Sequence, residues 1–145
     1  MFDVAASNIL NYFTGAWRLE RRVTDQPLMH GEAQFSPSAT QPNHLDFVER
    51  LSWPAANGQR IQAQRAYTYR RTDTGLAIDF ADGVSTGALF LAFDFDRASE
   101  LTSHHLCIAD HYDGRFVFHS AQAFELSFQV VGPHKDYHIR TRFER

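Results

Sequence analysis

The sequence predicts an all-β protein, an antiparallel β-barrel of 8–10 strands preceded by a short N-terminal helix. From residue 16 onward, apolar and polar residues alternate with the period of two that is typical of strands, and turn-forming residues interrupt the pattern at short intervals. Aromatic residues make up 14% of the chain, which favours strands. Short strands without intervening helices pack as a sandwich or close into a barrel, and closure removes the exposed sheet edges.

The first fifteen residues differ from the rest. Asp3 is the expected N-cap of a helix, and Gly15 is its expected end. We therefore predict one domain over residues 1–145, with a capping helix over 1–15 and a barrel over 16–145. The apolar side chains that would share one helical face are Phe2, Ile9, Leu10 and Phe13.

Ten strands are expected in the remainder of the chain. The breaks between them carry turn residues, for example Asn57-Gly58, Asp113-Gly114 and Gly132-Pro133. The expected strands are 16–24, 29–36, 44–53, 59–71, 75–81, 86–95, 100–110, 114–120, 123–131 and 135–144.

Composition excludes several classes of function. The net charge of −3 leaves no basic excess to neutralise phosphates, so we expect no nucleic-acid partner. Cys107 is the only cysteine, so no internal disulfide forms. The N-terminal residues have Asp3, no basic residue before Arg18 and no long apolar run, so we expect neither a signal peptide nor a membrane partner. The expected location is the cytoplasm, and the sequence leaves a homodimer open.

Three charged residues fall on otherwise apolar strand faces. They are Arg21, Glu49 and Arg65, and the alternation points all three toward the barrel interior. A buried charge is costly unless it is paired, so we expect Glu49 to contact at least one arginine. This cluster either fixes the barrel register or leaves one arginine, with Tyr67 and Tyr69, to receive an anionic or carbonyl group of a ligand.

A second constellation lies in one stretch of sequence, residues 105–112. His105 and Cys107 share one face, and Asp110 and Tyr112 share a face after an expected bulge near residues 108–109. A histidine near a carboxylate and a phenol is suited to acid–base chemistry or to ligand hydrogen bonding. The chain has no spacing typical of a metal site, so we expect no metal and interpret Cys107 as a small buried hydrophobe.

The chain resembles a family of small bacterial proteins of unknown function. The resemblance rests on His105-x-Cys107-x-x-Asp110-x-Tyr112, on Gly132-Pro133-x-Lys135-Asp136-Tyr137 and on the Gly-x-Trp of Gly15 and Trp17. It implies a calycin-like, lipocalin-like barrel and no particular activity. In such barrels the tryptophan closes one end, often beneath an arginine near the last strand, a role for which Arg140 or Arg142 is expected. The chain departs from the Gly-x-Trp-x-Gly-x-Gly opening of nitrobindin-like haem barrels, and no cofactor is expected.

The leading hypothesis is intracellular binding of a small amphipathic molecule, anionic or carbonyl-bearing, inside the barrel. The alternatives are a barrel enzyme, with His105 or Asp110 as base and Arg65 or Tyr67 stabilising an oxyanion, and a protein-interaction module with a filled core. The candidate ligand-binding residues are Arg65, Tyr67, Tyr69, His105, Tyr112, Arg21 and Glu49. One shared cavity is expected to be surrounded by Arg65, Tyr67, Tyr69, His105 and Tyr112.

Overall fold

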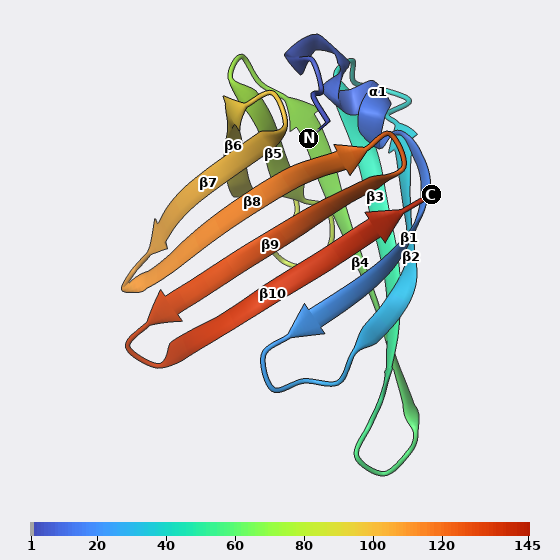
Figure 1. The fold of residues 1–145 in the computed structure, drawn as a ribbon, viewed down its shortest axis with the longest axis vertical. Coiled ribbons are helices and arrows are strands. Elements are labelled where there is room, and N and C mark those ends of the chain that lie inside the picture. Colours follow the sequence, from blue (N-terminus) through green and yellow to red (C-terminus); the bar gives the residue numbers. More distant parts are fainter. Residues whose placement is uncertain (1) are drawn as a thin grey trace.

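Each strand of the protein pairs with the strands that precede and follow it in the sequence. A computed structural model describes residues 2–145, and it shows ten antiparallel strands in the order of a closed meander (Figure 1). The strands are β1 (Gly15–Val23), β2 (Met29–Pro37), β3 (His44–Pro54), β4 (Arg60–Arg71), β5 (Gly75–Phe80), β6 (Leu89–Arg97), β7 (Glu100–Cys107), β8 (Asp110–Ser120), β9 (Ala123–Gly132) and β10 (Lys135–Glu144).

The barrel closes between the first and the last strand. β1 and β10 pair from Arg18 opposite Glu144 to Val23 opposite Ile139. The predicted all-β antiparallel barrel with a short N-terminal helix is therefore confirmed. Among residues 2–145, no helical segment is both long enough and apolar enough to cross a membrane.

The N-terminal helix is shorter than the sequence predicted. A 3₁₀ turn, η1 (Ala6–Asn8), leads into α1 (Ile9–Phe13). Asp3 does not cap this helix, contrary to expectation, because the chain has not yet become helical there. Instead, the backbone N–H of Val4 donates to the carbonyl oxygen of Ala98 over 2.8 Å, which ties the segment to the β6–β7 turn.

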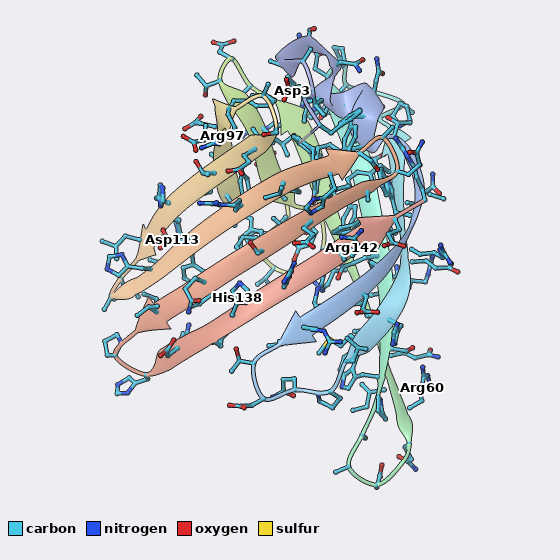
Figure 2. The ribbon with its side chains drawn as sticks, viewed as in Figure 1. Asp3, Arg60, Arg97, Asp113, His138 and Arg142 are labelled. Atoms are coloured by element: carbon cyan, nitrogen blue, oxygen red, sulfur yellow. The ribbon has the colours of Figure 1, made fainter. Side chains whose placement is uncertain are left out.

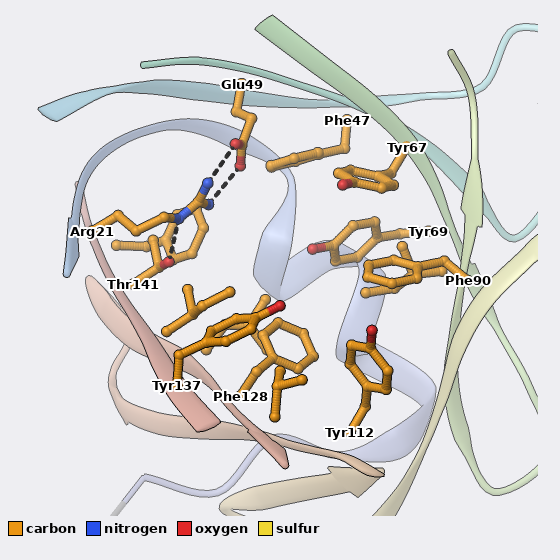
Figure 3. A pocket seen from close by; sticks show the side chains of 15 residues that line it. Arg21, Phe47, Glu49, Tyr67, Tyr69, Phe90, Tyr112, Phe128, Tyr137 and Thr141 are labelled. Atoms are coloured by element: carbon orange, nitrogen blue, oxygen red, sulfur yellow. Dashed lines mark hydrogen bonds and ion pairs between the residues drawn. The ribbon is translucent and has the colours of Figure 1, made fainter. Parts of the chain in front are cut away.

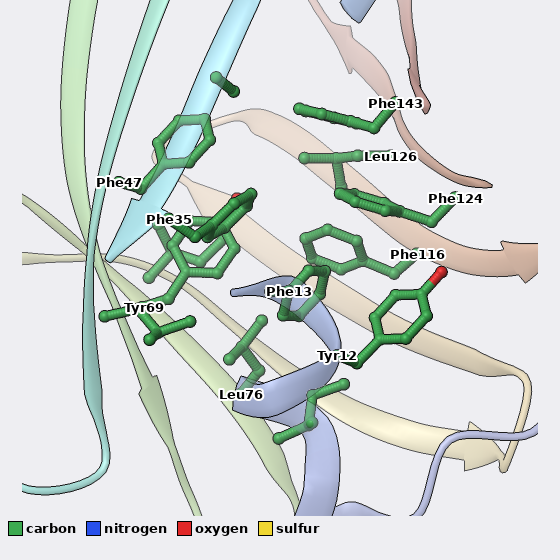
Figure 4. Close-up of a cluster of buried hydrophobic side chains, with 14 of the residues drawn as sticks. Tyr12, Phe13, Phe35, Phe47, Tyr69, Leu76, Phe116, Phe124, Leu126 and Phe143 are labelled. Carbon is green, nitrogen blue, oxygen red and sulfur yellow. The ribbon is translucent and has the colours of Figure 1, made fainter. Parts of the chain in front are cut away.

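Aromatic side chains fill the end of the barrel beneath α1 (Figure 4). Phe13 projects from α1 into this cluster and stacks on Phe35 with ring centroids 5.2 Å apart. Burying one such side chain is worth about 1.5–3 kcal/mol, so the cluster is a major source of stability. Three further aromatic rings of this cluster contact Phe13, those of Tyr69, Phe116 and Phe124.

Trp17 closes this end of the barrel, and an arginine covers it. The covering residue is Arg145, whose guanidinium carbon lies 4.1 Å from the centre of the indole. The expectation of Arg140 or Arg142 in this role is wrong: both lie on the outer face of β10 and pair with Glu125. Arg145 follows the end of β10, where it no longer has to obey the strand alternation.

The turn between β7 and β8 lies earlier than predicted. Cys107 and Asp110 pair directly across a two-residue turn, so the expected break at residues 113–114 is wrong and β8 runs through it. Ile108 occupies the turn with a φ of 58°, which a β-branched residue rarely adopts. Because the sequence there has no glycine or asparagine, it predicted a bulge at residues 108–109 within one strand, and that expectation is wrong: these two residues form the turn.

The end of the barrel away from α1 is less regular. The three residue pairs that join β6 to β7 all lie beside the β6–β7 turn near α1, between residues 94–97 and 100–102, and residues 89–93 do not pair with residues 103–107 farther from α1. The β3–β4 hairpin extends beyond the other strands at this end (Figure 1). Exposed charged side chains such as Arg60, Arg97 and Arg142 cover the outside of the molecule (Figure 2).

Candidate ligand-binding cavity

A cavity of about 220 Å³ lies inside the barrel. Fifteen side chains line it, and they come from all strands except β2 and β7. Eight of these side chains are aromatic, which gives the cavity largely apolar walls (Figure 3). The cavity lies next to the aromatic cluster under α1, because Phe47, Tyr69 and Phe143 belong to both.

An ion pair forms one polar side of the cavity. Arg21 donates through both terminal nitrogens to the two carboxylate oxygens of Glu49, each over 2.8 Å. The side chain of Glu49 is 5% exposed and that of Arg21 is 19% exposed, so water screens the pair poorly. The Nε of Arg21 donates to the Thr141 hydroxyl over 2.8 Å. The contact between Glu49 and an arginine expected from the sequence is present.

Four of the five tyrosines of the chain line this cavity, and the fifth, Tyr12, belongs to α1. The hydroxyls of the four tyrosines point toward the shared space in Figure 3. Burial raises the pKa of Tyr69 and of Tyr67 above the usual tyrosine value, so both hydroxyls stay protonated at neutral pH. The cavity therefore combines apolar ring surfaces with several neutral hydrogen-bonding groups. The four tyrosines are Tyr67, Tyr69, Tyr112 and Tyr137.

A β-bulge places Phe90 in the cavity. The register between β5 and β6 shifts between Ile78 and Asp79, so that Ile78 pairs with Leu91 and Asp79 with Leu89. The bulge leaves Phe90 without a partner and turns its side chain inward, as bulges near binding sites commonly do. Phe90 stacks on Tyr67, with centroids 5.7 Å apart and planes 17° apart.

The beginning of β8 and the β9–β10 turn meet beside the cavity. The Lys135 ammonium lies 3.0 Å from a carboxylate oxygen of Asp110 and donates to the Tyr112 hydroxyl over 3.2 Å. Gly132 leaves room for this arrangement, because a Cβ there would lie 1.9 Å from the other carboxylate oxygen of Asp110. Hydrogen bonds to Asp110 and Tyr112 raise the pKa of Lys135, so the amine stays charged.

Arg65 lies outside the cavity, contrary to expectation. Its side chain is 47% exposed, and its Nε donates to Asp82 over 3.2 Å. Arg65 pairs directly with Glu49 across β3 and β4, so it has the predicted strand face. At this position, however, the β3–β4 hairpin leaves the barrel, and the inward face of β4 becomes exposed.

His105 also lies outside the cavity, at the exposed end of the β7–β8 hairpin. It is the cross-strand partner of Tyr112, with ring centroids 6.2 Å apart, but only Tyr112 reaches the cavity. Cys107 is exposed rather than buried for the same reason. The structure thus does not gather His105, Asp110, Arg65 and Tyr67 into one acid–base site.

Of the seven predicted site residues, five line the cavity: Arg21, Glu49, Tyr67, Tyr69 and Tyr112. Three further polar or aromatic lining residues, Tyr137, Thr141 and Phe90, were not among the candidates. The alternation of β10 already placed Tyr137 and Thr141 on one face with Ile139, and that signal could have identified them. Phe90 had no such signal, because a bulge breaks the alternation.

This cavity-containing antiparallel meander defines the protein as a calycin-like β-barrel. The chain belongs to DUF6314, a family of unknown function, whose model matches residues 13–145. Among curated proteins, none matches the sequence.

Solved structures share the fold at low sequence identity. The S-type phycobiliprotein lyase CPES from Guillardia theta has a TM-score of 0.67 at 10% identity, over 98% of this chain and 93% of the lyase. The barrel EF1p2_mFAP2b bound to DFHBI has a TM-score of 0.52 at 14% identity, over 97% and 99% of the two chains. The redesigned barrel mFAP1 bound to DFHBI has a TM-score of 0.50 at 15% identity, over 94% of this chain and 97% of mFAP1. These likenesses concern the fold alone.

Proposed function

We propose that this protein binds one small amphipathic molecule inside the barrel. The observation that carries the proposal is the cavity of about 220 Å³, with aromatic walls and hydrogen-bonding groups on one side. Ligand sites have this combination of apolar lining and few placed polar groups. Because the cavity is smaller than the roughly 300–1,000 Å³ of most ligand pockets, it suits a compound of one or two rings rather than a long acyl chain. The DFHBI complexes of similar barrels are consistent with a small molecule in this architecture.

A carbonyl-bearing ligand fits the polar side better than an anionic one. Glu49 already neutralises Arg21 through two hydrogen bonds, so this side carries no net charge to attract a carboxylate. The Thr141 hydroxyl accepts from Arg21, which leaves its own hydrogen to donate to a ligand. The unionised Tyr69 hydroxyl offers a second donor to a carbonyl oxygen.

Native mass spectrometry of the protein purified from its own host tests this proposal. We expect a retained small molecule at one copy per chain. Ile139→Trp should abolish retention, because Ile139 lines the cavity and the larger side chain fills the space. His138→Trp is the matched control, because His138 is the exposed neighbour on the outer face of β10.

Retention by the Ile139→Trp variant, or its loss from both variants alike, would place the bound molecule elsewhere. Thermal unfolding of both variants checks that the barrel remains folded. A wild-type protein that carries no molecule, and that takes up none of the aromatic probes described below, would overturn the proposal.

A further inference from the structure

The hydrogen bond from Lys135 makes the Tyr112 hydroxyl an acceptor on that side and leaves it a donor toward a ligand. Lys135 is the only lysine of the chain, and its ammonium group can only donate hydrogen bonds. Because Lys135 donates to the Tyr112 oxygen, that oxygen is an acceptor in this contact. No residue among 2–145 accepts a hydrogen bond from the Tyr112 hydroxyl, and its oxygen lies at the cavity end of the ring (Figure 3), so the hydroxyl is free to donate to a ligand.

Asp110 keeps Lys135 in this position. The carboxylate of Asp110 lies 3.0 Å from the ammonium, in a space that only a glycine at position 132 leaves open. The ammonium also lies 5.8 Å from the centre of the Tyr112 ring, so it is near both the ring and its oxygen. Tyr112 is therefore held in one orientation by residues that do not themselves line the cavity.

We propose that Tyr112, oriented by Lys135 and Asp110, is a second recognition point that selects ligands with a hydrogen-bond acceptor at a position distant from the Arg21–Glu49 pair. This inference rests on the proposed binding function and specifies its ligand class. The ligand is an aromatic compound with two carbonyl-type oxygens, one facing Thr141 and Tyr69 and the other facing Tyr112. Tyr112 contacts the ligand, whereas Lys135 is a positioning residue.

Three probes built on the same para-disubstituted benzene ring separate the two recognition points. Para-diacetylbenzene has a carbonyl at each end, para-ethylacetophenone has one, and para-diethylbenzene has none. Isothermal titration of the full-length protein should give affinities in that order. We expect about fivefold to tenfold per carbonyl, the worth of one net hydrogen bond.

Substitutions of Tyr112 or Lys135 should change only the difference in affinity between the probe with two carbonyls and the probe with one. In Tyr112→Phe, para-diacetylbenzene should bind no more tightly than para-ethylacetophenone, while para-diethylbenzene keeps its wild-type affinity. Lys135→Met should reduce the preference for para-diacetylbenzene over para-ethylacetophenone. Lys135→Arg should retain this preference, because arginine also only donates hydrogen bonds. Arg140→Met is the matched control, because it removes a cation from the outer face of β10.

The outcomes distinguish this inference from the proposed function. If the wild type binds all three probes equally well, or if Tyr112→Phe weakens all three equally, the cavity binds ligands but Tyr112 does not select them. If Lys135→Met and Lys135→Arg behave alike, Lys135 does not position the hydroxyl. If no probe binds and no molecule is retained from the host, the proposed function fails, and this inference fails with it.

Discussion

Glu49 and Arg21 form an ion pair whose two members depend on each other. Because Glu49 is almost fully buried, its removal leaves the guanidinium in a poorly solvated position with only the Thr141 oxygen as partner. Breaking a buried pair costs about 3–5 kcal/mol. The partial exposure of Arg21 puts the expected value at the lower end of this range.

Urea unfolding should therefore show that Glu49→Ala lowers the free energy of unfolding by about 3 kcal/mol. Glu32→Ala is the control, because Glu32 is exposed on the neighbouring strand β2, and it should change stability by less than about 0.5 kcal/mol. The double variant Glu49→Leu with Arg21→Met should recover most of the loss, since apolar residues can replace a buried ion pair. A loss below about 0.5 kcal/mol for Glu49→Ala would show that water solvates Arg21 fully.

The β7–β8 hairpin is the element with the clearest backbone strain. Ile108 has a φ of 58° and its side chain is fully exposed, so it carries the cost of a left-handed conformation without burying its side chain. Glycine adopts this conformation without a steric penalty.

We expect Ile108→Gly to raise the free energy of unfolding by about 1 kcal/mol, the strain of one such residue less the added entropy of the unfolded chain. Ile61→Gly is the control: Ile61 is also an exposed isoleucine, but it lies within β4 and has no positive φ. That substitution should destabilise the protein. Destabilisation by Ile108→Gly in thermal unfolding would contradict the strain assigned to this turn.

Over the whole molecule, a packed end and a hollow end share one barrel. Phe13 is fully buried among other aromatic rings, whereas Phe90 is partly buried and faces the cavity. Truncation of a packed phenylalanine leaves a void, while truncation of a cavity wall enlarges a space that already exists.

Phe13→Ala should therefore cost about 3–5 kcal/mol of stability, and Phe90→Ala clearly less. Phe90→Ala should in addition weaken the binding of the aromatic probes, because the ring of Phe90 forms part of the wall. Equal losses of stability for the two variants in urea unfolding would contradict a division into a packed and a hollow end.

The strand alternation, together with the turn residues between strands, predicted the all-β meander and the pairing of Glu49 with an arginine. These features follow from local periodicity, because successive side chains of a strand point to opposite faces. The same alternation placed Tyr67, Tyr69 and Tyr112 on faces that line the cavity.

Only the tertiary structure decided where along each strand an inward face is actually enclosed. Arg65 and His105 have the correct strand face, but both side chains meet solvent. Arg65 lies where the β3–β4 hairpin extends past the other strands, and His105 lies on β7 beyond Thr102, the last residue of β7 that pairs with β6. The bulge that turns Phe90 inward depends on the pairing of β5 with β6, which the β6 sequence does not reveal. Periodicity fixes the direction of a side chain, whereas burial depends on how far the neighbouring strands extend, and that is a property of the assembled barrel.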